Sequence, residues 1–138
     1  MRAVLRPREG ISIMMSDNFW KYFFELLETL PRQGPGTRES TERALGLLPP
    51  LTSEQRILDI GCGVGAQSLY LARACPAQIL ATDIHEPFLK TLRKNAAEAG
   101  LADRIETQVA DMGGLPYEDA SFDVLWAEGS SFIFGFSR

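Results

Sequence analysis

Several features are scarce in this sequence of 138 residues, and each absence narrows its function. The chain has 14 lysines and arginines against 18 acidic residues and no run of basic residues, which argues against binding of a nucleic-acid backbone. No apolar stretch approaches the roughly 18 residues of a membrane span. Cys62 and Cys75, with a single histidine, are too few for a disulfide framework or a zinc site. We therefore expect a cytoplasmic protein with reduced thiols and no metal.

The composition is that of one soluble globular unit, because 45% of the residues are hydrophobic and 23% are charged. Residues 1–13 show no periodicity, and the Met14-Met15 pair resembles a natural translation start. We expect residues 1–15 to be a loose extension. Apolar residues at helical spacing after Asp17, and again between Thr37 and Leu48, predict two helices within a helical cap over residues 16–50.

From residue 51 to residue 138 the pattern alternates between short apolar strands and helices. Strands are predicted at 56–60, 79–82, 105–109 and 122–127, and helices at 66–74 and 87–99. This alternation indicates β-α-β units, and therefore an α/β, Rossmann-like, doubly wound parallel sheet. Because the strands are apolar on both faces, we expect helices on both sides of the sheet.

A glycine-rich turn directly follows the first predicted strand. The run from Arg56 to Ala66 reads RILDIGCGVGA, with glycines at 61, 63 and 65. Glycine permits positive φ and a close approach of the backbone to a ligand. The pattern alone is weak, but the carboxyl end of such a strand is where open parallel sheets bind ligands.

Asp83 ends the second predicted strand, 22 residues after Gly61. A carboxylate at this point can accept hydrogen bonds from both hydroxyl groups of a ribose. The alternative is structural, since Asp83 could simply cap the helix that begins near Pro87. Together, the glycine turn and Asp83 favour a nucleoside-containing ligand.

Two further segments complete a family pattern. Val109-Ala110-Asp111-Met112 follows the third strand, and Phe122 to Gly129, FDVLWAEG, forms the fourth strand and its exit. With these elements in order, the chain from Asp17 to Ser130 resembles the class I S-adenosylmethionine-dependent methyltransferases, in their small-molecule branch.

The resemblance implies S-adenosylmethionine as the cofactor, a small-molecule methyl acceptor, and specific binding roles. Gly61, Cys62, Gly63 and Gly65 would line the methionine and ribose, and Asp59 would reach the amino group directly or through water. Asp83 would hold the ribose hydroxyls and Ile84 the adenine face, while Asp111 and Met112 would meet the adenine edge. Glu128 would face the methyl group and is the catalytic candidate, and the segment 33–37 resembles a loop that folds over the site.

An NAD-binding oxidoreductase fragment is the competing enzyme class. The dinucleotide pattern wants a third glycine one position later, where this chain has Ala66, although alanine is tolerated there. Neither Asp111-Met112 nor the 123–128 segment has a counterpart in that pattern. His85 is interpreted as a solvent-facing loop residue, and Cys62 as a small spacing residue without an activating base.

The chain departs from the resemblance at its end. Class I methyltransferases have a seven-stranded sheet, and this sequence stops at Arg138, just past the fourth predicted strand. An exposed sheet edge then invites self-association. A degenerate fragment without catalysis, acting as an interaction module, is thus the alternative to an enzyme.

Overall fold

The computed structural model describes residues 17–130. The elements follow the order α1 (Asp17–Glu28), α2 (Arg38–Leu45), β1 (Arg56–Ile60), α3 (Ala66–Ala74), β2 (Gln78–Asp83), α4 (Glu86–Glu98), β3 (Ile105–Val109) and β4 (Val124–Trp126). The α/β class is as predicted, and the expected extension over residues 1–15 lies outside the described residues. The boundary of the helical cap at residue 50 stays a prediction.

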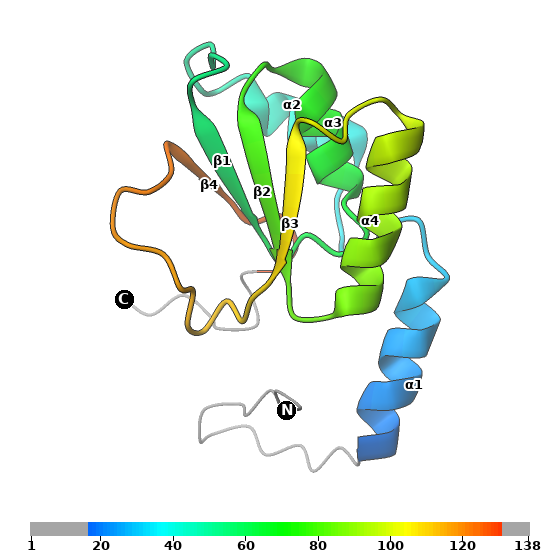
Figure 1. Cartoon of the computed structure of the whole chain (residues 1–138). Helices are drawn as coiled ribbons and strands as arrows, with labels where there is room; N and C mark the ends of the chain where they lie inside the picture. The colour runs from blue at the N-terminus through cyan, green and yellow to red at the C-terminus, as the bar shows by residue number, and fades with distance from the viewer. Residues whose placement is uncertain (1–16, 131–138) are drawn as a thin grey trace.

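The four strands form one parallel sheet in the order β3-β2-β1-β4 (Figure 1). Ile57 lies beside Ile79 in the register of β1 and β2, and Ile79 lies beside Ile105 in that of β2 and β3. These three side chains are buried together with Leu71 of α3 and Leu92 of α4 in the core. The carboxyl ends of all the strands therefore meet at one edge of the sheet.

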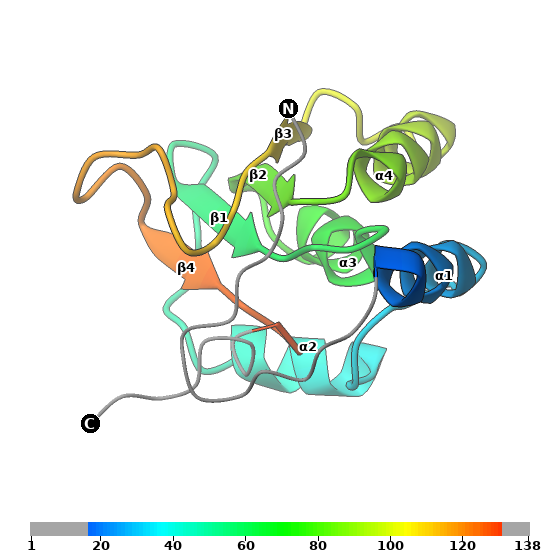
Figure 2. The same cartoon turned by 90° about the horizontal axis from the view of Figure 1, so that it is seen from below.

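Within the described residues, the helices lie on one side of the sheet, which differs from the expected two-sided cover (Figure 2). On the opposite face, Leu58 and Leu80 are buried, whereas Leu125 of β4 is 68% exposed. The segment between β3 and β4 contributes contacts there: the Tyr117 hydroxyl donates to Gln108 (3.0 Å). A loop thus replaces the expected helical contact on this face.

Helix α1 extends from the body and is attached mainly through aromatic contacts (Figure 1). Phe24 stacks on the His85 ring with centroids 4.4 Å apart, and it also meets Phe88 edge-on. His85 Nε2 lies 2.6 Å from Glu28 Oε1. The prediction of a solvent-facing His85 is therefore wrong, because α1 covers the ring.

None of the helices in residues 17–130 is long and apolar enough to cross a membrane.

Candidate functional site

The glycine-rich turn connects β1 to α3 with three left-handed residues. Gly61, Gly63 and Gly65 have φ values of +69°, +58° and +79°. A Cβ on Gly63 would collide with the side-chain oxygen of Gln33, and one on Gly65 would collide with Leu92 of α4. The glycine at 65 is therefore explained by helix packing, whereas Gly63 keeps room for a group arriving from the cap.

Gln33 is held over this turn by contacts at both ends of its amide. Its Nε2 donates to the carbonyls of Leu27 and Leu30, at 3.0 and 2.9 Å. Its Oε1 accepts the Val64 backbone N–H at 2.8 Å. Gln33 thus lies over the turn, whereas Gly34 lies near Gly129 and Gly36 near Glu128. The folding of segment 33–37 over an active site stays a prediction, and sequence reasoning did not identify Gln33 as a contact residue.

Asp83 sits next to the turn at the end of β2. One carboxylate oxygen accepts the Gly63 N–H (2.9 Å) and the other accepts the His85 N–H (3.0 Å). Burial raises the pKa of Asp83, and these backbone donors counteract part of that rise. Each carboxylate oxygen can accept more than one hydrogen bond, so acceptor capacity remains for a ligand hydroxyl.

The adenine-side candidates lie beside this acid. The Ala110 N–H donates to the Asp83 carbonyl (3.1 Å), which brings the start of the 111–112 turn to the same edge. The Met112 methyl group lies 3.0 Å from the position that a Cβ on Gly61 would occupy. Asp111 is exposed and accepts the Gly113 N–H at 2.8 Å, while Ile84 is half-buried.

Asp59 lies deeper than predicted. It is fully buried, with one oxygen bound by Ser68 Oγ and the other 3.3 Å from Gln67 Nε2. Burial raises its pKa to about 6, against the lowering effect of these two donors. In this arrangement Asp59 orients the first turn of α3, and its contact with the cofactor's amino group, directly or through water, stays a prediction.

Cys62 is also buried in the turn. Its Sγ donates to the Gly63 carbonyl at 3.3 Å, and its backbone N–H bonds the Thr82 carbonyl at 2.9 Å. Burial raises the pKa of the thiol well above its ordinary value. These features agree with the interpretation of Cys62 as a spacing residue, since a protonated buried thiol is a poor nucleophile.

Glu128, the catalytic candidate, is the centre of a polar network between the sheet and the cap. Its carboxylate accepts hydrogen bonds from Arg32 (2.6 Å), Ser40 (3.2 Å), Thr41 (2.9 and 2.8 Å) and the Trp126 indole (3.1 Å). Four donor groups thus surround the two oxygens, and the Thr41 hydroxyl lies between them. This geometry fits a residue that fastens the cap to the sheet better than one that accepts a substrate proton.

Ser130 is a buried residue of the site that sequence reasoning missed. Its Oγ donates to the Ile60 carbonyl at 2.7 Å and lies against Gly61. A serine just after a strand carries no distinctive pattern, so only the fold identifies it. Together with Met112, Ser130 occupies the space toward which a Cβ on Gly61 would point.

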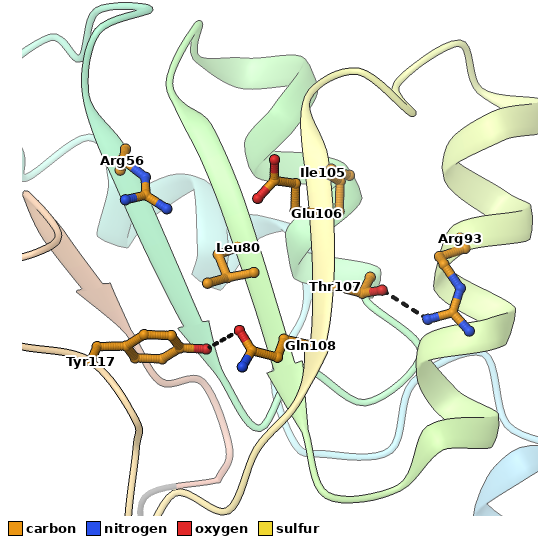
Figure 3. Close-up of a pocket in the computed structure, with 8 residues that line it drawn as sticks. All are labelled: Arg56, Leu80, Arg93, Ile105, Glu106, Thr107, Gln108 and Tyr117. Carbon is orange, nitrogen blue, oxygen red and sulfur yellow. Dashed lines mark hydrogen bonds between the residues drawn. The ribbon is translucent and has the colours of Figure 1, made fainter.

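A separate hollow lies over β3 and the open face of the sheet, away from these residues. It has a volume of about 700 Å³ and is lined by residues that include Tyr117, Gln108, Glu106 and Arg93. Figure 3 shows Tyr117 directed toward Gln108, with Arg93 approaching Thr107 from the helical side. None of its lining residues belongs to the predicted site.

Comparison with known proteins gives a consistent result. The family described as "Methyltransferase domain" matches residues 57–137. A 27-O-demethylrifamycin SV methyltransferase of Amycolatopsis mediterranei is 40% identical over 91 residues, covering 66% of this chain and 33% of that protein. A tRNA1(Val) (adenine(37)-N6)-methyltransferase of Phocaeicola vulgatus is 38% identical over 81 residues, covering 59% of this chain and 34% of that protein.

Among solved structures, an S-adenosylmethionine-dependent methyltransferase of Geobacter sulfurreducens in complex with S-adenosyl-L-homocysteine is similar. It is 26% identical with a TM-score of 0.68, and the match covers 84% of this chain and 46% of that one. The match spans about a third of the length of the rifamycin and tRNA methyltransferases.

Proposed function

The chain belongs to the class I S-adenosylmethionine-dependent methyltransferase family, and from that premise we propose that residues 17–130 hold S-adenosylmethionine for methyl transfer to a small molecule. One observation supports this most strongly. Asp83, the glycine turn and Met112 gather at the carboxyl edge of the sheet, with the Asp83 carboxylate bonded to the Gly63 N–H.

The residues present fit this cofactor in their chemistry. Gly61 and Gly63 offer a backbone without side chains, and Asp83 retains acceptor capacity for two ribose hydroxyls. Ile84 and Met112, both half-buried, supply apolar contacts for the adenine, and the exposed Asp111 supplies an acceptor at its edge. Gly65 and Asp59 support the site indirectly: Gly65 allows the turn to pack against α4, and Asp59 orients the first turn of α3.

S-adenosylmethionine, when bound, supplies an activated methyl group on a positively charged sulfur. The chain's own task is to hold donor and acceptor in line and to exclude water, because alignment accounts for much of the acceleration of such a displacement. We assign the cap segment 33–37 to exclusion of water and Glu128 to positioning of that segment through Arg32. No residue of the described chain is assigned as a base.

We propose a small molecule as the methyl acceptor, in the cytoplasm. The rifamycin-modifying relative supports the acceptor class, and two unpaired cysteines support a reducing compartment. The tRNA-modifying relative offers the alternative acceptor. The net charge of −4 and the lack of a basic run favour the small molecule.

A non-catalytic interaction module is the second proposal, and it rests on a different observation. Strand β4 is an edge strand that pairs with β1 alone among the described strands, and its Leu125 is 68% exposed. Such an edge can pair with another chain. Self-association through β4 would appear as a dimer in analytical ultracentrifugation that a Leu125→Lys change dissolves.

Calorimetric titration with S-adenosylhomocysteine tests the first proposal. We expect saturable binding that is lost in Asp83→Ala and retained in Asp103→Ala, a control at an exposed loop position. Nicotinamide dinucleotide is the ligand control. A folded chain that binds the dinucleotide, or that binds neither ligand, would contradict the proposal.

A further inference from the structure

A recess between α2 and α3 concentrates positive charge, and Ala66, which directly follows the glycine turn, lies at its border. We call it the α2–α3 recess, and its volume is about 490 Å³. Its lining includes Arg32, Arg38 and Arg73. The two helices lie next to each other in both views (Figures 1 and 2).

The spacing of residues along the two helices explains the shape of the recess. Ala66, Tyr70 and Ala74 follow each other at intervals of four residues on α3, so they share one face of the helix. The two alanines leave space on either side of the tyrosine ring. On α2, Arg38 and Thr41 are three residues apart and border the same space.

The arginines differ in how their charge is compensated. Arg32 is paired with Glu128 at 2.6 Å, and its Nε is buried without a hydrogen-bond partner. Arg38 lies 5.3 Å from the centroid of the Tyr70 ring. Within residues 17–130, neither Arg38 nor Arg73 forms an ion pair with a carboxylate.

This cluster does not follow from the overall composition, because the chain is acidic with a net charge of −4. Both guanidinium groups belong to exposed residues that border one recess, and the charge of Arg38 also acts on the Glu39 carboxylate. An anion bound between Arg38 and Arg73 would be stabilised by both. Guanidinium groups present paired N–H donors that match carboxylate and phosphate oxygens. The volume of the recess also falls in the range of small-molecule sites, about 300–1,000 Å³.

We propose that the α2–α3 recess binds an oxyanion, either phosphate or the carboxylate or phosphate group of a small molecule, through Arg38 and Arg73. The site is additional to the proposed cofactor site, since none of the cofactor candidates lines it. Arg32 and Thr41 form the wall between the two, because both also bind Glu128. An anion in the recess therefore meets the network that fastens the cap.

Titration of the whole chain with inorganic phosphate, in low-salt buffer free of other polyvalent anions, tests the proposal by calorimetry. We expect saturable binding that Arg38→Gln/Arg73→Gln weakens at least about tenfold, since two charge-assisted contacts are lost. Arg43→Gln is the matched control, because Arg43 is on α2, is exposed and does not line the recess. A parallel titration with acetate separates the sources: stronger binding of acetate assigns a carboxylate ligand, and stronger binding of phosphate a phosphate ligand.

Absence of saturable binding of both anions, or an equal loss in Arg43→Gln, would overturn the proposal. Circular dichroism checks the fold of the double variant. If the double variant is unfolded, the same phosphate titration of the single Arg73→Gln variant, at an exposed position, decides the question. Binding of S-adenosylhomocysteine is measured on the same variants. Binding of phosphate without binding of S-adenosylhomocysteine would contradict the proposed function and support the oxyanion site. Binding of S-adenosylhomocysteine without binding of phosphate or acetate would support the proposed function and overturn the oxyanion site.

Discussion

Replacement of Asp59 by asparagine should make the folded chain more stable at neutral pH. Asp59 is fully buried beneath the glycine turn and is held by Ser68 and Gln67, and no basic side chain of residues 17–130 forms an ion pair with it. Asparagine has nearly the same shape and keeps an oxygen for one of these donors. The change therefore removes a buried negative charge without opening a cavity.

The magnitude follows from the pKa of Asp59, which burial raises from 3.8 to about 6. Each pH unit of such a difference corresponds to about 1.4 kcal/mol, so ionisation of Asp59 destabilises the fold by up to about 3 kcal/mol. The sign follows from proton binding: the native state holds this proton more tightly than the unfolded chain. The stability contributed by the protonated Asp59 is fully present below about pH 4 and is lost as the pH rises through about 6.

Urea denaturation between pH 4 and pH 8 measures this effect as a difference between variants. We expect Asp59→Asn to be about 1–3 kcal/mol more stable than the wild type at pH 8, with the advantage vanishing toward pH 4. Asp103→Asn, at an exposed position, should follow the wild-type curve. Parallel stability curves for Asp59→Asn and the wild type across this range would refute the reasoning.

Three further outcomes are expected. In a urea titration, Gly63→Ala should lower the free energy of unfolding by about 1–3 kcal/mol, because φ is +58° and the added methyl collides with the Gln33 side chain. Gly114→Ala is the control: Gly114 has open space around it, so the change should alter this free energy by less than about 0.5 kcal/mol. Glu128→Gln should lower the free energy of unfolding by about 2 kcal/mol and speed proteolysis of the cap, because charge-assisted hydrogen bonds are lost. The exposed Glu98→Gln should have little effect, and equal destabilisation by both changes would contradict a structural role of the Glu128 network. Cys62 should resist alkylation at pH 8 until the chain is denatured, as followed by mass spectrometry, because its thiol is buried and its pKa is raised.

The parallel sheet could be predicted from local pattern, because each strand and helix has its own period and its own stop. Arg56–Ile60, Ala66–Ala74 and Ile105–Val109 coincide with the predicted ranges, and the ends of the other predicted strands and helices differ by a few residues. The apolarity of the strands was not sufficient to predict helices on both faces of the sheet. Leu58 and Leu80 are buried on the second face although no described helix covers it.

The proximity of Gly63 and Asp83 could be predicted, because each follows or ends a neighbouring parallel strand, and their roles toward the cofactor stay predictions. What the sequence could not reveal was direction. Asp59 lies within β1, whereas Asp83 ends β2, and the period of two along β1 turns the Asp59 side chain toward α3. Glu128 accepts hydrogen bonds from residues almost ninety positions away. Such long-range partners, including Gln33 on Val64, leave no local signal.

The central claim is that the carboxyl edge of this sheet holds S-adenosylmethionine. Amide chemical-shift mapping of the isotopically labelled chain with S-adenosylhomocysteine tests it residue by residue. We expect saturable shifts clustered at 61–65, 83–85 and 111–113, with small changes at Arg73 in the α2–α3 recess. Shifts confined to the recess or to the hollow over β3, or no saturable shifts in a folded chain, would contradict it.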